Sequence, residues 1–244
     1  MLSDLHCHIL PGVDDGAENM DVTERMLRAE RDAGVRQIIF TPHFYAERQD
    51  VDVFLARRAD AVRQVKKICS ELQISQKAGA EVYMSSELLE VDLPSLCMGD
   101  TNYLLLEWPS VYPLWGEEMV DHLLDQGIRP VFAHIERYSC FFAKEKNLDP
   151  YIRKGALCQM NAGTLLKPDL QKRALELIRR KYVHILSSDA HNMRSRAPHT
   201  AEAYEVIKNR LGGSWAEKLA ENASAVFHGE DLCIEDTKKR FGWW

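Results

Sequence analysis

Seven short apolar runs recur along the 244-residue chain, and most of them are followed by a stretch with the periodicity of an amphipathic helix. The runs cover residues 2–6, 37–41, 74–81, 103–107, 129–133, 156–160 and 184–187, and helical periodicity appears at 22–33, 51–72, 170–181, 199–211 and 215–222. Strands that alternate with helices are typical of parallel sheets, because a parallel pair needs a long crossover connection. The pattern predicts an α/β fold and fits both a (β/α) barrel one unit short of eight and an open doubly wound sheet.

No repeat, low-complexity segment or long linker interrupts this pattern, so we expect one domain over residues 1–244. The net charge of −6 and the lack of a basic stripe argue against nucleic acid as a partner. The sequence has no signal peptide and no apolar stretch of membrane-spanning length, so we expect a cytoplasmic protein without membrane insertion. The six cysteines are scattered and none begins a Cys-x5-Arg motif, so we expect reduced thiols and no cysteine nucleophile.

Residues of metal-ligating types stand at the carboxyl ends of six of the seven predicted strands. In a barrel these ends converge on one face, where active sites are built. In an extended segment, His6 and His8 point to the same side, whereas Cys7 points to the other side, toward the helix layer. The candidate residues are His6, His8, His43, Glu81, Glu107, His134, Asp189 and His191, joined by Asp15 of the Asp14-Asp15-Gly16 turn.

Each candidate taken alone has an ordinary alternative. His43 and His134 are compatible with hydrogen-bonded core histidines, Asp189 is compatible with a helix N-cap, and Asp15 with a plain turn residue. Glu107 differs, because a carboxylate after three leucines is costly to bury without a metal or a counter-charge. It is a poor explanation that all nine residues have unrelated structural roles. We therefore interpret them as members of one shared site. The other histidines are predicted to be structural or surface residues, namely His122, His184, His199 and His228.

The donor types predict the kind of metal. Imidazole and carboxylate donors without thiolate favour manganese, iron or zinc over a cysteine-type structural zinc site. Nine donors exceed the needs of one ion, so we expect two or three ions bridged by a carboxylate such as Glu81. Such a centre lowers the pKa of a bound water and neutralises charge on a phosphoryl or acyl oxygen.

Several of these residues lie in longer motifs. The motifs are, in chain order, Asp4-x-His6-x-His8, Val13-Asp-Asp-Gly16, Thr41-Pro-His43, Gly79-Ala-Glu-Val-Tyr83, Leu106-Glu107, Ala133-His-Ile-Glu-Arg-Tyr138 and Ser188-Asp-Ala-His-Asn192. Together, from residue 4 to about 198, they resemble the polymerase-and-histidinol-phosphatase (PHP) superfamily, and within it the protein tyrosine phosphatases of bacterial capsule and exopolysaccharide synthesis. The resemblance implies a distorted (β/α)7 TIM-like barrel, as a single domain over residues 1–244. C-terminal helices and an aromatic tail, 241–244, are expected after about residue 198, and the tail lies outside the resemblance.

The resemblance also implies a trinuclear centre, often with manganese, in which all nine residues named above are ligands. It further assigns phosphate binding to Arg137 of the His-Ile-Glu-Arg motif and to Arg196 of Ser195-Arg-Ala-Pro198. Arginine suits this task because its planar guanidinium group donates to two oxygens at once. The alternative for Arg196 is a surface-loop arginine.

The function implied by this resemblance is hydrolysis of phosphotyrosine by a metal-activated hydroxide. The expected partner is a tyrosine-phosphorylated bacterial protein, namely the tail of a tyrosine kinase that regulates capsule or exopolysaccharide synthesis. Three alternatives stay open: a small-molecule phosphatase of the same superfamily such as histidinol phosphatase, a metal-dependent amidohydrolase, and a binding module that keeps metals for structure. The amidohydrolase class is expected to have a lysine at a mid-chain strand end, where this sequence has glutamates.

Overall fold

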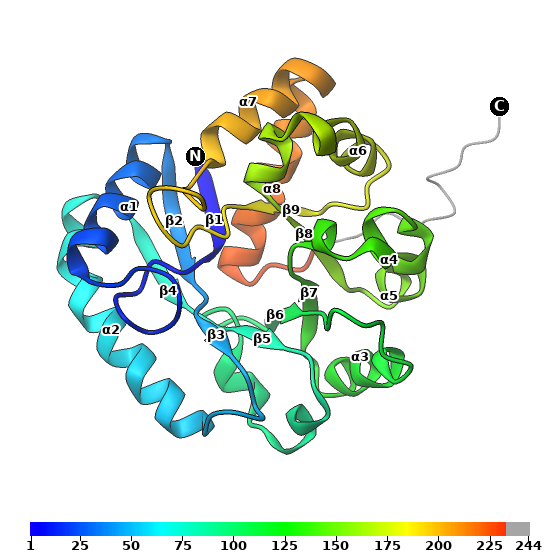
Figure 1. Ribbon diagram of the computed structural model, residues 1–244, viewed down its shortest axis with the longest axis horizontal. Coiled ribbons are helices and arrows are strands. Elements are labelled where there is room, and N and C mark those ends of the chain that lie inside the picture. Colours follow the sequence, from blue (N-terminus) through cyan, green and yellow to red (C-terminus); the bar gives the residue numbers. More distant parts are fainter. Residues whose placement is uncertain (233–244) are drawn as a thin grey trace.

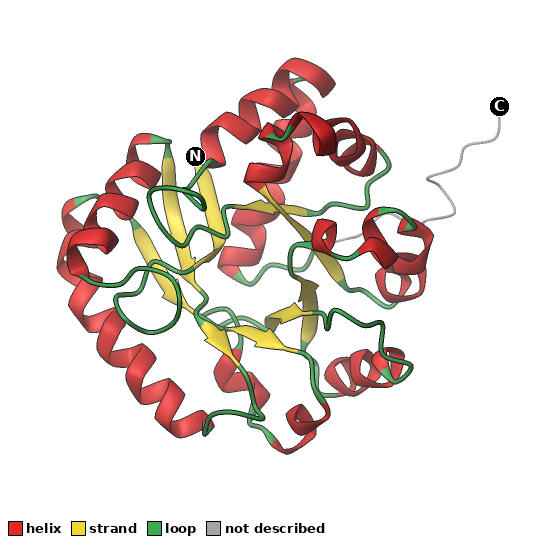
Figure 2. Ribbon diagram, viewed as in Figure 1, coloured by secondary structure: helices red, strands yellow, loops and turns green. Residues whose placement is uncertain are grey.

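Parallel strands curl around a common interior, and helices cover their outer side, in the computed structural model, which describes residues 1–232 (Figures 1 and 2). The predicted α/β class is confirmed, and the curled parallel sheets have the shape of part of a barrel within a single domain. The predicted aromatic tail, 241–244, and Cys233 lie outside the described residues.

All strand pairs in the two sheets are parallel. One sheet has the order β1 (Leu2–Cys7), β2 (Val35–Phe40) and β4 (Ser75–Ala78). The other has the order β3 (His43–Phe44), β5 (Glu81–Tyr83), β6 (Tyr103–Glu107), β7 (Arg129–Phe132), β8 (Leu157–Asn161) and β9 (Ile185–Ser187). Parallel order places the carboxyl ends of these strands on one face, which is the arrangement that the sequence predicted.

The prediction of one continuous strand over 74–81 is wrong, because β4 ends at Ala78 and β5 begins at Glu81. A Cβ atom on Gly79 would lie 3.1 Å from the Cα of Met98, so the chain bends where two backbone segments approach closely. The neighbouring chain is interrupted at Pro42, which has no backbone N–H to donate. Hydrogen bonding nevertheless continues across the break, since the N–H of Glu81 donates to the carbonyl of Pro42 at 3.1 Å. The residues described therefore form nine assigned strands where seven were predicted.

Strand β1 lies beside the segment that follows β9, although the two are far apart in the sequence. The N–H of Asp189 donates to the carbonyl of His6 at 2.7 Å, and Cys7 pairs with Ala190 in a parallel bridge. Two residues before His6 on β1, the carboxylate of Asp4 accepts two hydrogen bonds from Ser188, one from the backbone N–H at 2.9 Å and one from the side-chain hydroxyl at 2.5 Å. The first strand is thereby fixed to the last part of the sheet.

Helices connect the strands on the outside of the sheets. They are α1 (Met20–Asp32), α2 (Val51–Glu71), α3 (Gly116–Asp125), α4 (Ser139–Phe142), α5 (Asp149–Arg153), α6 (Pro168–Arg179), α7 (Thr200–Leu211) and α8 (Gly213–His228). Short 3-10 helices are η1 (Ser86–Glu90), η2 (Leu93–Leu96), η3 (Ile135–Arg137), η4 (Glu145–Leu148) and η5 (Ala162–Leu166). Asn19 caps α1 by accepting from the N–H of Val22, and Asp50 caps α2 in the same way. The predicted helices at 22–33, 51–72, 170–181 and 199–211 are confirmed, and α8 is longer than the predicted 215–222.

The buried apolar residues fill the space between sheets and helices. Cys7 packs in a cluster with Met26 and Leu27 of α1, and its Sγ lies 3.6 Å from the carbonyl oxygen of Ile39. Its side chain therefore faces the helix layer, as the alternation along β1 predicted. Within the described part of the chain, no helix combines the length and the apolar character that a membrane span requires.

Candidate metal centre

The residues predicted as ligands converge at the carboxyl ends of the strands. Among the described residues there are three groups of potential metal ligands, and within each group the donor atoms all lie within 4.8 Å of one another. The groups are His8, Asp15, His43 and His191; His6, His8, Glu81 and Asp189; and His43, Glu81 and Glu107. The groups share His8, His43 and Glu81, so they form one continuous cluster. His134 belongs to the same cluster through its Nε2 atom, which lies 2.6 Å from Oε1 of Glu81.

Glu81 lies at the centre of this cluster and is 1% exposed. Its Oε2 atom is 3.1 Å from Nε2 of His6, 3.1 Å from Nε2 of His8 and 3.0 Å from Nδ1 of His43. Burial alone would raise the pKa of Glu81, but the charge of His6 and the hydrogen bond from His134 outweigh it and hold this pKa well below its usual range. Glu81 is thus an ionised carboxylate surrounded by imidazoles, which is the arrangement expected of a bridging ligand.

His6 and His8 point to the same side of β1, and their Nε2 atoms lie 3.3 Å apart. Each ring is held from behind through its Nδ1 atom: His6 by Oε1 of Gln159 at 3.1 Å, and His8 by Oδ2 of Asp14 at 2.6 Å. A partner at Nδ1 fixes the ring orientation and leaves the lone pair of Nε2 for a ligand. Burial lowers the pKa of His8, but the hydrogen bond to Asp14 and the nearby carboxylates raise it well above the usual value.

The orienting residues were not predicted. Gln159 also accepts from the backbone N–H of His134 at 2.7 Å, and its amide nitrogen donates to Oδ1 of Asn161 at 2.9 Å. Asn161 in turn donates to Oδ2 of Asp189 at 2.6 Å. Gln159 and Asn161 stand two residues apart on β8, so the alternation that placed His6 and His8 on one face would have placed these amides on one face too.

Several buried donor atoms of the cluster have no hydrogen-bond partner. They are Nδ1 of His43, Oε2 of Glu81, Oε2 of Glu107, Nδ1 of His134 and Nε2 of His191. Unpaired buried polar atoms are costly and rare in folded proteins, so a group of them at one place points to a missing ligand. Nitrogen and carboxylate oxygen atoms without a thiolate suit divalent manganese, iron or zinc, and the residues present therefore fit the predicted kind of metal.

Two predicted ligands have a backbone conformation that favours glycine. His134 has a φ of +31° and Asp189 a φ of +53°. Such angles cost energy in residues with a side chain and persist at functional sites where the surroundings enforce them. The next described helix after Asp189, α7, begins only at Thr200, so the alternative role of Asp189 as an N-cap does not apply.

Glu107 and Asp15 occupy the outer part of the cluster. Oε1 of Glu107 is 3.8 Å from Nε2 of His134, and burial together with the charge of Glu81 raises the pKa of Glu107 to about 7. Oδ1 of Asp15 lies 3.4 Å from Nε2 of His43 and 3.4 Å from Nε2 of His191, although the side chain of Asp15 is 65% exposed. These two carboxylates therefore lie at the solvent-facing edge of the buried centre.

The two arginines predicted to bind phosphate both contact Asp189. Arg137 donates to Oδ2, and Arg196 donates from Nη2 to Oδ1 at 2.8 Å. Burial raises the pKa of Asp189, but the charge of His6 and the hydrogen bond from His8 lower it well below its usual range. The side chain of Arg137 remains 41% exposed, so its guanidinium group reaches solvent at the edge of the cluster.

The other four histidines contribute no donor to the three groups found among residues 1–232. His122 contacts Gln126 on α3, the ring of His184 accepts from the N–H of Cys158, and His228 contacts Gln37. His199 lines a cavity beside Arg196.

Comparison with known proteins places the chain in a family. The family model described as capsular polysaccharide synthesis, CpsB/CapC, matches residues 2–228. The chain is 31% identical over 236 residues to the tyrosine-protein phosphatase YwqE of Bacillus subtilis (strain 168), with 94% of this chain and 92% of the relative covered. It is also 31% identical over 232 residues to the tyrosine-protein phosphatase CpsB of Streptococcus pneumoniae, with 88% and 93% covered.

A solved structure agrees with this placement. It comes from work on YwqE from Bacillus subtilis and CpsB from Streptococcus pneumoniae, described as metal-dependent tyrosine phosphatases. It superposes with a TM-score of 0.86 at 28% sequence identity and covers 96% of this chain and 98% of its own. The chain therefore belongs to the CpsB/CapC family of capsular polysaccharide synthesis proteins.

Proposed function

We propose that this protein is a metal-dependent protein tyrosine phosphatase, a phosphoric monoester hydrolase that acts in capsule or exopolysaccharide synthesis. The observation that carries the proposal is the buried cluster around Glu81, where donor atoms without hydrogen-bond partners face one another. The relatives named tyrosine-protein phosphatase support the same activity.

The nine predicted ligands are assigned to two or three metal ions, with manganese as the expected metal and iron or zinc as alternatives. The set is His6, His8, Asp15, His43, Glu81, Glu107, His134, Asp189 and His191. Bound ions supply a water of lowered pKa and positive charge for the phosphoryl oxygens. Asp14 and Gln159 hold the rings of His8 and His6 in the orientation that ligation requires.

The arginines bind the phosphoryl group in this proposal. Arg137 and Arg196 are held by the same carboxylate, Asp189, so their guanidinium groups lie at one edge of the centre. A guanidinium group neutralises charge that grows on phosphoryl oxygens, and its fixed position costs no reorganisation during the reaction. The leaving phenolate has a solution pKa of about 10, so a strong general acid is not required.

The fold is interpreted as the distorted seven-stranded barrel of the PHP type. In this interpretation β2 and β3 are one strand interrupted at Pro42, and β4 and β5 are one strand interrupted at Gly79. The hydrogen bonds that continue across both breaks, and the pairing of β1 with the segment after β9, support it.

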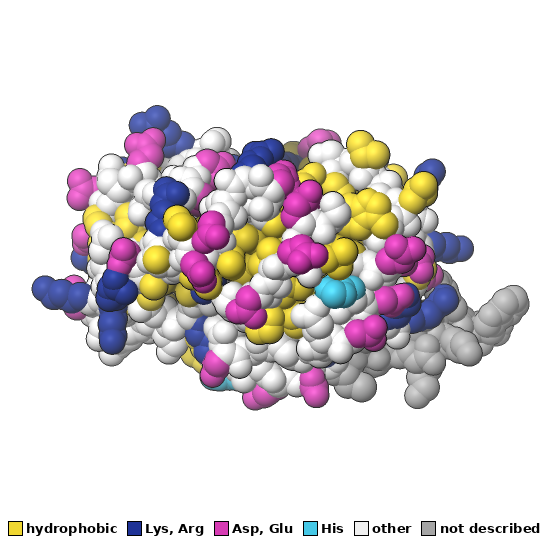
Figure 3. All heavy atoms as spheres, turned by 90° about the horizontal axis from the view of Figure 1, so that it is seen from below, with side chains coloured by type: hydrophobic (Ala, Val, Ile, Leu, Met, Phe, Trp, Pro, Cys, Tyr) yellow, Lys and Arg dark blue, Asp and Glu magenta, His cyan; other side chains and the backbone are white. Residues whose placement is uncertain are grey.

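The proposed partner is a tyrosine-phosphorylated bacterial protein, specifically the tail of a tyrosine kinase that regulates polysaccharide synthesis, and the proposed location is the cytoplasm. The capsule-synthesis family and the names of the relatives support a phosphotyrosine protein as substrate. On the face seen in Figure 3, acidic and basic side chains are interspersed without a broad basic patch.

Two assays test the activity. Prolonged EDTA treatment should abolish hydrolysis of p-nitrophenyl phosphate, and added manganese should restore it. The manganese-loaded protein should then hydrolyse a phosphotyrosyl peptide faster than histidinol phosphate. A preference of a hundredfold or more for histidinol phosphate would identify a metabolite phosphatase instead, and no activity with manganese, iron or zinc would favour a binding module that keeps metals for structure.

A further inference from the structure

A cavity of about 450 Å³ adjoins the candidate metal centre on one side. Glu107 and Arg137 belong to its lining, so the cavity shares a wall with the metal centre and with the proposed phosphate site. Tyr83, Trp108 and Tyr138 form much of the remaining wall. The cavity is thus polar and charged at the end next to the metals and aromatic elsewhere.

The tyrosines owe their position to the strands that carry the predicted ligands. Tyr83 follows Glu81 by two residues on β5, and residues two apart on a strand share a face. Tyr83 therefore lies on the same side of β5 as Glu81, two residues nearer the carboxyl end of the strand. Tyr138 follows the strand end at His134, and the rings of these two residues are 5.7 Å apart. The same strand ends supply both the metal donors and the aromatic wall.

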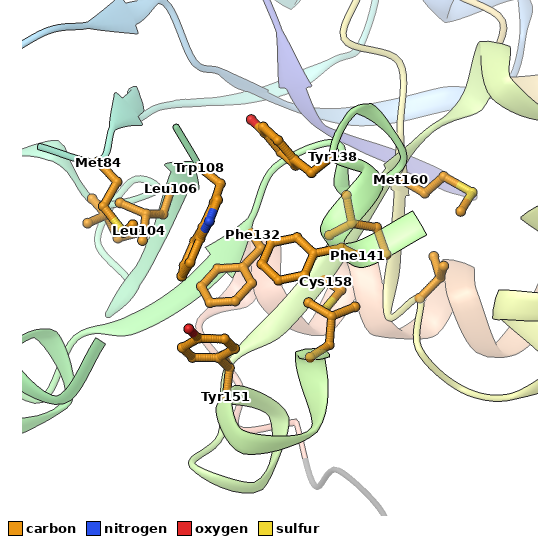
Figure 4. Packing of buried hydrophobic residues seen from close by; sticks show 14 of the residues in the cluster. Met84, Leu104, Leu106, Trp108, Phe132, Tyr138, Phe141, Tyr151, Cys158 and Met160 are labelled. Atoms are coloured by element: carbon orange, nitrogen blue, oxygen red, sulfur yellow. The ribbon is translucent and has the colours of Figure 1, made fainter. Parts of the chain in front are cut away.

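Trp108 and Tyr138, two of the three aromatic residues of this wall, are packed into the core before any ligand binds. Trp108 is 1% exposed, and its ring lies 4.9 Å from that of Phe132 and 5.2 Å from that of Phe141 (Figure 4). Tyr138 also packs against Phe141 at 6.1 Å, while its hydroxyl points away from the phenylalanine rings (Figure 4). A wall that is ordered in advance spares a ligand the cost of ordering it.

Three other cavities beside the centre, lined by described residues, differ in character. A cavity of about 510 Å³ near Asp15 and one of about 340 Å³ near Arg196 have no Phe, Tyr or Trp in their lining. A third, of about 380 Å³, has the single tyrosine Tyr45. Aromatic side chains therefore gather on the Glu107 side of the centre.

We propose that the cavity lined by Tyr83, Trp108 and Tyr138 binds the aryl ring of the substrate while the phosphoryl group lies between the metal centre and Arg137. This inference rests on the proposed phosphatase function and adds the basis of its preference for phosphotyrosine. An aromatic ring gains from offset or edge-to-face contacts with aromatic walls, whereas the short alkyl group of phosphoserine has no ring to place there. Tyr83 and Tyr138 are thus specificity residues, and the phosphate-binding part of the site is separate from them.

Competitive inhibition separates the ring from the phosphate, because phosphonates bind without being hydrolysed. The probes are phenylphosphonate, methylphosphonate and inorganic phosphate, tested on the manganese-loaded protein. We expect the inhibition constant of phenylphosphonate to be at least about tenfold lower than that of methylphosphonate. Tyr83→Leu and Tyr138→Leu should each raise the inhibition constant of phenylphosphonate about threefold to tenfold. Neither substitution should change that of inorganic phosphate more than about twofold.

Three further variants test whether the aryl ring binds in this cavity. Tyr138→Phe retains the ring and should retain the affinity for phenylphosphonate. Ser110→Trp places a large side chain at an exposed position of the cavity lining, and should weaken phenylphosphonate without disturbing the core. Tyr45→Leu compares the neighbouring cavity, which Tyr45 lines, although its ring also lies 5.6 Å from that of Tyr83. It should raise the phenylphosphonate constant less than Tyr83→Leu does.

Equal inhibition constants for phenylphosphonate and methylphosphonate in the unmodified protein would overturn the proposal. It would also be overturned if Tyr45→Leu alone weakened phenylphosphonate, since the ring would then bind in the other cavity. Failure of the phosphatase function itself has a different signature, namely no hydrolysis of the phosphotyrosyl peptide by the unmodified, manganese-loaded protein.

Discussion

Oδ2 of Asp14 lies 2.6 Å from Nδ1 of His8 and turns the opposite ring nitrogen of His8 toward Glu81. The same carboxylate accepts from the backbone N–H of His43 at 3.0 Å and from that of Gly16 at 3.0 Å. Asp14 therefore connects His8, directly after the end of β1, with His43 at the start of β3, and it shapes the loop that carries Asp15. Burial raises the pKa of Asp14, but the hydrogen bond from His8 outweighs it and lowers that pKa below its ordinary value.

Asp14→Asn should weaken metal binding about tenfold to a hundredfold. An amide keeps the shape of the carboxylate but loses the negative charge that makes His8 a stronger metal ligand. Titration of the metal-free protein with manganese measures the dissociation constant. Asp21→Asn, at an exposed carboxylate of α1, is the control and should bind manganese like the unmodified protein. An unchanged dissociation constant in Asp14→Asn would mean that Asp14 only shapes the loop.

Arg137→Ala should lower the turnover number for a phosphotyrosyl peptide about a hundredfold or more, because it removes charge stabilisation next to the reacting phosphoryl group. Metal content, measured by elemental analysis after dialysis against manganese, should stay close to that of the unmodified protein. Arg194→Ala is a suitable control, since Arg194 is exposed in the loop that carries Arg196. Normal turnover in Arg137→Ala would remove this arginine from the phosphate site.

Gln159→Leu should destabilise the metal-free protein by at least about 2 kcal/mol. The substitution leaves the backbone N–H of His134 and Nδ1 of His6 buried without their acceptor, and each such loss costs about 1–3 kcal/mol. Urea unfolding in EDTA measures the difference without a contribution from bound metal. Gln126→Leu, at an exposed glutamine of the α3 end, should change the stability by less than about 0.5 kcal/mol.

Glu30→Gln should make the protein progressively more stable than the unmodified protein as the pH rises from about 5 to 8. Burial, and then the charge of Asp4, raise the pKa of Glu30 well above its ordinary range. The folded protein thus retains a proton that the unfolded chain has released, so this group's contribution to stability falls as the pH increases toward the folded pKa. The slope is at most about 1.4 kcal/mol per pH unit for one proton.

Urea unfolding at several pH values measures this effect as a difference between the variant and the unmodified protein, so titration of groups other than Glu30 and the interacting Asp4 cancels. Glu24→Gln, at an exposed glutamate of the same helix that pairs with Arg28, should show no such trend. A difference that stays constant with pH would mean that Glu30 is ionised in the folded protein.

The sequence predicted the strand-end cluster because its members obey local rules. Alternation places His6 and His8 on one side of β1, and parallel strands bring their carboxyl ends to one face. The break at Pro42 agrees with the end of the predicted strand at residue 41, because proline has no N–H to donate. The break at Gly79 could not be predicted in the same way, since it depends on the tertiary contact between Gly79 and Met98, to which no sequence pattern refers.

Gln159 shows a different limit. A search for histidines and carboxylates passes over an amide, although Gln159 connects two predicted ligands, His6 and His134, through one oxygen atom. Residues that orient ligands need only hydrogen-bonding ability, and many residue types have it. Their spacing on a strand is therefore a better guide than their chemistry.

The hydrogen bonds between Asp4 and Ser188 span 184 positions of the chain. During synthesis on the ribosome, His6 and His8 emerge among the first residues, whereas Asp189 and His191 follow only after most of the polypeptide has been made. Domains whose defining contacts join distant segments complete their structure late, because the loop between those segments must first close. The proposed metal site can consequently form only after the segment at Ser188 has joined β1, and a nascent chain that stalls before Ser188 carries His6 and His8 without their proposed partners.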